Sequence, residues 1–114
     1  MLLVFGIGMS ANAQQCSFEV TNVSSSISGS TVTLTVTVEP TFTPNNQEFY
    51  EVVVKPTGEL RSLLDSQRKS VTFQSKSSGD WWDRRKTVTF TCSVEDNSYR
   101  QCRKQDFSTT CFKK

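Results

Sequence analysis

Two stretches of strict alternation constrain the fold of this chain more than any other feature. In the run STVTLTVTVEP (residues 30–40), valine or leucine occupies every second position and threonine the positions between them. The run KTVTFTCSVED (residues 86–96) repeats this pattern, with Val88, Phe90 and Cys92 on one side. Side chains on a strand point alternately to opposite faces, so each run predicts a strand with one dry and one wet face. Two such strands favour an antiparallel sandwich whose sheets are each solvated on one side.

Shorter segments predict the remaining strands. They are CSFEVTNV (16–23), ended by the run SSSISGS, then QEFYEVVVKP (47–56), KSVTFQSKS (69–77), and a C-terminal pair near YRQCRK (99–104) and STTCF (108–112). The segment ELRSLLDS (59–66) fits one helical turn as well as a short edge strand. We therefore predict a single all-β, antiparallel β-sandwich of about seven strands.

This strand order resembles the small secreted modules of the immunoglobulin and fibronectin type III class, including the adhesion-type variants found in exported bacterial proteins. The likeness covers residues 16 to about 112 and rests on the pattern FEVTNV … STVTLTVTVEP … EFYEVVVKP … KSVTFQS … KTVTFTCSVED. It implies an immunoglobulin-like sandwich that serves as a scaffold for binding or for assembly. The chain departs from true immunoglobulin domains, because no tryptophan lies on the third predicted strand and no cysteine on the second.

The N-terminal stretch MLLVFGIGMSANAQ predicts a secretory signal peptide. An apolar run from Leu2 to Met9 is followed by the A-x-A pattern of Ala11 and Ala13, although no basic residue precedes the run. The run is shorter than the roughly 20 apolar residues that span a bilayer. A buried N-terminal strand is the alternative interpretation. We expect residues 1–13 to be removed and residues 14–114 to form one domain that is secreted or otherwise extracytoplasmic, at the cell surface or in a periplasm.

The four cysteines predict two disulfide bonds, because an even number of cysteines behind a signal peptide is typical of oxidised, exported domains. Cys92 and Cys102 bracket a hairpin centred on Asn97, which favours the pair Cys92–Cys102 and leaves Cys16–Cys111 to join the two ends of the domain. The pairing of Cys16 with Cys92 and of Cys102 with Cys111 stays open. Zinc is excluded by the long cysteine spacings and the lack of histidine.

The side-chain chemistry predicts a protein that is not an enzyme. The chain has no histidine, which removes the commonest general base, Ser–His nucleophiles and most transition-metal sites. Its eleven acidic residues are scattered, mostly at expected strand ends and turns, a placement typical of solvated surface. No glycine-rich phosphate loop is present. We expect neither a cofactor nor a metal.

Positive charge gathers in the C-terminal third. From residue 76 onward nine basic residues face five acidic ones, whereas the rest of the chain has an excess of acids. The segments WWDRRK (81–86) and YRQCRK (99–104) would flank neighbouring strands, where their bases would form one positive patch suited to anionic glycans or an acidic protein surface. The alternative is that these bases protect edge strands from aggregation. Nucleic acid is not an expected partner of an exported protein that lacks an aromatic-studded basic sheet.

The two adjacent tryptophans raise the sharpest question about function. A regular strand counted back from Phe90 would place Lys86, Arg84 and Trp82 inward, and a sandwich core cannot hold two charges. The strand must therefore begin near Lys86, and GDWWDR must form a loop or bulge with at least one indole exposed or capping the sandwich. The alternative is that both rings shield the end of the core. Tryptophan is enriched at binding hot spots, and arginine beside it adds stacking and charge. The candidate binding residues are Trp81, Trp82, Arg84, Arg85, Lys86, Arg100, Arg103 and Lys104.

The sequence thus favours a secreted, non-catalytic binding or adhesion module, or a subunit of an extracellular assembly, with residues 80–86 as its contact surface. The expected partner is a protein or an anionic glycan on a surface, and self-assembly is a further option; no membrane span is expected. One alternative is a small exported inhibitor or effector that acts on a protein target. Another is a structural or decoration protein of a virion or filament, whose free sheet edges dock on neighbours.

Overall fold

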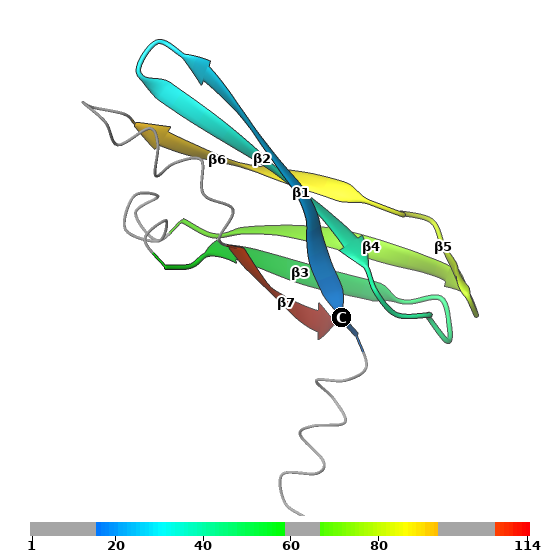
Figure 1. Cartoon of the computed structure of the whole chain (residues 1–114). Helices are drawn as coiled ribbons and strands as arrows, with labels where there is room; N and C mark the ends of the chain where they lie inside the picture. Colours follow the sequence, from blue (N-terminus) through cyan, green and yellow to red (C-terminus); the bar gives the residue numbers. More distant parts are fainter. Residues whose placement is uncertain (1–15, 59–66, 94–106) are drawn as a thin grey trace, which may run out of the picture.

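Among the residues that the structure describes, seven strands form two antiparallel sheets. The computed structural model describes residues 16–58, 67–93 and 107–114, and no helix occurs among them. The strands are β1 (Phe18–Ser28), β2 (Thr31–Pro40), β3 (Phe49–Pro56), β4 (Lys69–Ser77), β5 (Asp80–Trp81), β6 (Lys86–Ser93) and β7 (Phe107–Lys113). Sheet A has the order β1-β2-β6 and sheet B the order β5-β4-β3-β7, and the two lie as layers facing each other (Figure 1).

The predicted all-β sandwich is confirmed, and so is each predicted strand that falls on the described residues. Among them is the strand that was expected to begin near Lys86, which starts at that residue. The predicted signal peptide (1–13), the segment 59–66 and the strand near residues 99–104 lie outside the described residues. Among the described residues no helix is long and apolar enough to cross a membrane.

Strand β1 is longer than its sequence predicts. The serine run was expected to end it, yet β1 continues through Ser28 and pairs with β2 from Ile27↔Val32 to Ser28↔Thr31. The serines lack an apolar alternation of their own, but β2 beside them supplies the backbone hydrogen-bonding partners. A tight turn at Gly29, with φ of 61°, closes the hairpin; glycine adopts this left-handed conformation without a Cβ clash.

The core lies where the dry faces of the two sheets meet. Every second residue of β2, from Val32 to Val38, is fully buried, and the threonines between them are not. Strand β6 contributes Val88, Phe90 and Cys92, and sheet B contributes Val52, Val54 and Phe73. The alternation in the sequence therefore reports directly which face of each strand packs inward.

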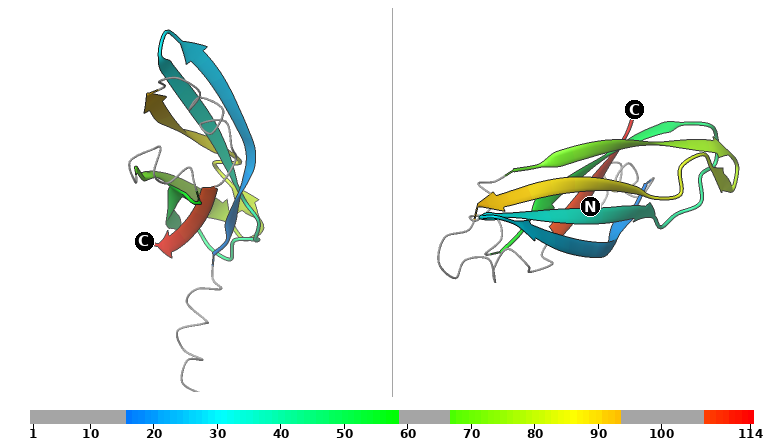
Figure 2. Two further views of the ribbon diagram at one scale, coloured as in Figure 1. Left: turned by 60° about the vertical axis from the view of Figure 1, so that its left-hand side comes forward. Right: turned by 90° about the horizontal axis from the view of Figure 1, so that it is seen from above.

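A disulfide bond joins the two sheets along one side. Cys16, just before β1, is bonded to Cys111 on β7 with an S–S distance of 2.02 Å, and the two cysteines are 95 residues apart in sequence. Nearby, the Thr109 hydroxyl donates a 2.7 Å hydrogen bond to the carbonyl oxygen of Phe18. Figure 2 shows β7 beside the start of β1. The bond confirms the predicted Cys16–Cys111 pair and excludes the alternative pairing; Cys102, the predicted partner of Cys92, lies outside the described residues.

We expect the double variant Cys16→Ser/Cys111→Ser to lose about 2–5 kcal/mol of unfolding free energy, because a cross-link over such a long segment strongly restricts the unfolded chain. Chemical denaturation of the oxidised wild type and the variant would measure this. Peptide mapping without reduction supplies the control: a peptide that links Cys16 to Cys92 would contradict the topology.

Candidate functional site

The loop between β4 and β6 leaves sheet B through a turn that requires glycine. Gly79 has a φ of 82°, where other residues are strained, and its N–H donates a 2.8 Å hydrogen bond to the carbonyl oxygen of Pro44. The short strand β5 then pairs with β4, with Trp81 opposite Ser75. The sequence predicted a loop or bulge here, and pairing with β4 is what fixes its conformation.

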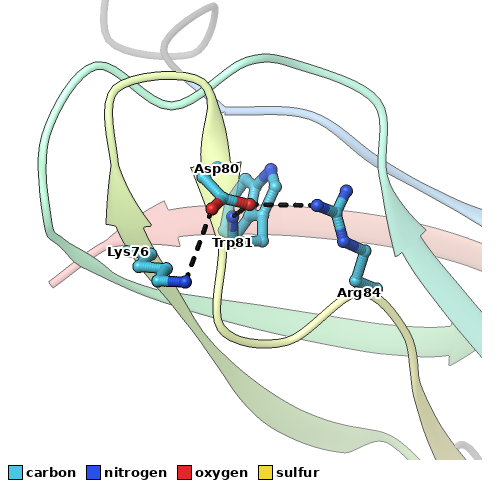
Figure 3. Close-up of polar contacts among 4 residues, drawn as sticks. All are labelled: Lys76, Asp80, Trp81 and Arg84. Carbon is cyan, nitrogen blue, oxygen red and sulfur yellow. Dashed lines mark hydrogen bonds and ion pairs between the residues drawn. The ribbon is translucent and has the colours of Figure 1, made fainter.

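Asp80 holds this loop together. One oxygen of its carboxylate accepts hydrogen bonds from the backbone N–H of Trp81 at 2.8 Å and from the Arg84 guanidinium at 2.9 Å. The Lys76 ammonium lies 3.6 Å from the other oxygen, so the two cations approach the carboxylate from different sides (Figure 3). The Trp81 N–H, followed by the charges of Lys76 and Arg84, lowers the pKa of Asp80 below its ordinary value.

Asp83 and Trp82 continue the hydrogen bonding to β4 beyond the end of β5. Its carboxylate accepts a 2.8 Å hydrogen bond from the backbone N–H of Gln74, and the N–H of Trp82 donates to the carbonyl oxygen of Gln74 at 3.1 Å. A side chain thus takes the place that a neighbouring strand's carbonyl would occupy. The other Asp83 oxygen lies 3.8 Å from the Lys86 ammonium. Neither aspartate is the merely solvated acid that the sequence suggested.

Trp81 belongs to the core. It is 8% exposed and packs in a cluster of five aromatic rings at this end of the sandwich. Its ring centroid lies 5.2 Å from that of Phe42, 5.7 Å from Tyr50 and 5.9 Å from Phe18, mostly in edge-to-face arrangements. Such contacts add about 0.5–1.5 kcal/mol per pair beyond area burial. Trp81 therefore anchors the loop.

Trp82, in contrast, projects into solvent with 58% of its surface exposed. Because Trp81 faces inward on β5, the next residue faces outward. The Lys76 ammonium lies 4.9 Å from the centroid of the Trp82 ring, a cation–π contact. A strand counted back from Phe90 would have placed Trp82 inward; the break between β5 and β6 reverses that assignment.

Two more exposed aromatic rings share the outer surface of sheet B with Trp82. Phe49 on β3 is 49% exposed and lies opposite Gln74, the residue that pairs with Trp82; Phe112 on β7 is 51% exposed and lies opposite Glu51. Their inward-facing neighbours on β3 and β7 set their direction. We call Trp82, Phe49 and Phe112 the aromatic face. Phe49 and Phe112 are not among the binding residues predicted from the sequence, although Phe49 precedes the alternating buried residues Tyr50 and Val52 on the same strand and must therefore face outward.

The segment that joins β2 to β3 packs against the same end of β4. Ser75, fully buried, donates its hydroxyl hydrogen to the carbonyl oxygen of Asn46 at 2.6 Å and accepts from the N–H of Glu48 at 2.8 Å. The Ser75 hydroxyl thus fixes the segment to β4, and the bond from the Gly79 N–H to Pro44 joins it to the β4–β6 loop. The two loops form one rigid unit.

The predicted binding residues divide into four groups. Trp82, Arg84 and Arg85 are exposed on one loop, whereas Trp81 lies in the core. Lys86 is half-buried, with its ammonium 6.0 Å from the centroid of the Phe73 ring, and caps the core. Arg100, Arg103 and Lys104 lie outside the described residues. No group of three or more potential metal ligands gathers among the described residues.

Comparison of the chain with protein-family models, with curated proteins and with solved structures finds no match.

Alanine substitutions distinguish the buried tryptophan from the exposed one by their effect on stability. We expect Trp81→Ala to cost about 3–5 kcal/mol of unfolding free energy, as loss of a buried aromatic ring does, and Trp82→Ala to cost less than about 0.5 kcal/mol. Chemical denaturation measures both. Acrylamide should quench the remaining indole of Trp81→Ala more readily than that of Trp82→Ala; equal costs for the two variants would contradict this assignment.

Acid should release the loop at a pH set by Asp80. Because the folded pKa lies below the ordinary value of 3.8, ionised Asp80 stabilises the loop above that pH, and this contribution disappears as the pH falls through the folded pKa. We expect the NMR shift of the Trp81 backbone N–H to titrate with a midpoint below 3.8. Asp80→Asn should abolish this transition and Glu19→Gln, a change at an exposed residue of β1, should leave it intact. A midpoint at or above 3.8 would show that the carboxylate is not held in this way.

Proposed function

We propose that the protein is a secreted, non-catalytic binding module that attaches to a surface glycan through the aromatic face. One observation carries this proposal: Trp82 is largely exposed on a loop whose conformation is already fixed by Asp80, Asp83 and the anchor Trp81. An exposed ring on a rigid support loses little conformational freedom on binding, and this favours affinity. The disulfide bond supports an oxidising, extracytoplasmic location.

The composition of the aromatic face favours a glycan over a protein ligand. Its rings are separated by polar side chains: Gln74 lies between Trp82 and Phe49, and Glu51 lies opposite Phe112. Neighbouring strands are about 5 Å apart, so Trp82 and Phe49 are separated by roughly 10 Å. Protein interfaces bury a continuous apolar centre. A chain of sugars instead offers apolar ring faces alternating with hydroxyl groups, which suits rings spaced by an amide and a carboxylate.

Removal of the Trp82 ring should abolish attachment without unfolding the domain. We expect Trp82→Ala to weaken retention on immobilised polysaccharides at least tenfold in affinity electrophoresis, and Phe49→Ala to weaken it less. Ile27→Ala is the matched control, because Ile27 is 47% exposed at the opposite end of sheet A, near the β1–β2 turn. Retention of Trp82→Ala equal to that of Ile27→Ala would refute the proposal, as would failure of the wild type to bind any member of a broad glycan panel.

A further inference from the structure

A cleft opens on the other side of the loop that carries Trp82. It has a volume of about 370 Å³ and lies between the segment that follows β2 and the residues from Gly79 to Arg85. Its lining includes Glu39, Phe42, Thr43, Trp81, Arg84 and Arg85. The volume falls within the range typical of small-molecule sites. Of the eight candidate binding residues predicted from the sequence, this cleft brings together Trp81, Arg84 and Arg85.

The walls of the cleft are held in place before any ligand arrives. The hydrogen bond from the Gly79 N–H to Pro44 joins them at 2.8 Å, and the Thr41 N–H donates to the carbonyl oxygen of Ser17 at 2.9 Å. The rings of Phe42 and Trp81 pack edge to face at 5.2 Å and give the cleft an apolar wall. A ligand that enters would therefore meet a formed site with one apolar surface.

The charges in the cleft suit a single anionic group. Arg85 is exposed and forms no ion pair with a described residue. Arg84 is held by Asp80 through one nitrogen, which leaves other N–H donors of its guanidinium available. The only acid in the lining is Glu39, whose carboxylate accepts a 2.7 Å hydrogen bond from the Thr21 hydroxyl. Asp80 and its second partner Lys76 lie beside Arg84, so the cations Lys76, Arg84 and Arg85 face the carboxylates of Asp80 and Glu39. The local excess is one positive charge.

We propose that this cleft binds the anionic substituent of a glycan, a sulfate ester or a uronate carboxylate, with Arg85 as its main contact. This inference rests on the proposed glycan binding and specifies the class of glycan. A guanidinium donates two parallel N–H bonds to such a planar or tetrahedral oxyanion. The sugar ring that carries the group packs on the Phe42 and Trp81 wall, and Glu39 on the same cleft limits the site to one anionic group.

The test uses two pairs of probes. The first pair is a heparin-derived tetrasaccharide and its fully desulfated counterpart; the second is an oligogalacturonate and its methyl ester. We expect calorimetry to show that, in one of the two pairs, wild type prefers the probe with the intact sulfate or carboxylate groups to its desulfated or esterified partner, and that the preference falls as salt is added. The pair that shows the preference identifies the anion as sulfate or carboxylate. Absence of a preference in both pairs overturns the proposal.

Charge variants locate the binding. Arg85→Gln should weaken binding of the preferred probe at least tenfold and change binding of its desulfated or esterified partner far less. Glu39→Gln should strengthen binding of the charged probe a few-fold, because it removes the opposing charge. Arg68→Gln is the matched control, since Arg68 is an exposed arginine at the opposite end of β4. If Arg85→Gln and Arg68→Gln bind the preferred probe with equal affinity, the cleft is not its binding site. Circular dichroism checks that each variant is folded.

A monosaccharide separates this inference from the proposed function. N-acetylglucosamine 6-sulfate is too small to span the loop, so it should shift the NMR signals of Gly79 and Arg85 in both wild type and Trp82→Ala. If the sulfated sugar shifts these signals but the protein binds no polysaccharide, anion binding in the cleft is supported and glycan attachment through the aromatic face is refuted. The opposite outcome is that polysaccharides bind through Trp82, whereas neither the sulfated sugar nor the galacturonate probe shifts the NMR signals of Gly79 and Arg85. In that case only the proposed anion site in the cleft is refuted.

Discussion

Burial of the dry face of β2 is the constraint on which the rest of the structure depends. Val32, Leu34, Val36 and Val38 are fully excluded from water, and each is flanked by neighbours on β1 and β6. At roughly 1.5–3 kcal/mol per buried aliphatic side chain, this one strand supplies a large share of the apolar burial in a small domain. The domain buries a limited fraction of its surface at this size, so a cross-link between the sheets is a substantial addition.

The same core determines where a binding surface can form. The five-ring cluster closes one end of the sandwich and holds Trp81, and the loop that Trp81 anchors carries Trp82 outward and the two arginines to the opposite side. Adjacent tryptophans thus have opposite roles: one ring stabilises the domain and the next is free for contact. An exposed ring on a well-supported loop would lose little conformational freedom on binding.

Much of the fold could be predicted from the sequence because threonine and valine differ so clearly in their preference for water. Alternation located β2 and β6, and the cost of burying Arg84 and Lys86 located the start of β6. The position of Cys92 and Cys102 around an expected turn favoured the Cys16–Cys111 bond, which the structure confirms. What the sequence left undetermined depends on contacts across long sequence distances: β5 exists because Trp81 pairs with Ser75, and β1 extends to Ser28 because β2 lies beside it.

The candidate site was predicted less well, for the same physical reason. The sequence identified the loop, but the inward direction of Trp81 depends on the register of β5 against β4 rather than on β6. Asp80 and Asp83 looked like solvated acids, since nothing local shows that the backbone N–H groups of Trp81 and Gln74 point at them. The outward direction of Phe49 could have been predicted, because Tyr50 and Val52 on the same strand face the core and their neighbour must face outward.

The buried hydroxyl of Ser75 has a kinetic consequence. Because it fixes the segment after β2 to the strand that carries the tryptophan loop, neither wall of the proposed site would have to fold or close on binding a ligand. Association would then proceed in a single step, at a rate limited by encounter and orientation, and differences in affinity among ligands would arise mainly from how slowly each one leaves. A surface decorated with many copies of a weak ligand would hold such a rigid module through rapid rebinding rather than through one long-lived contact.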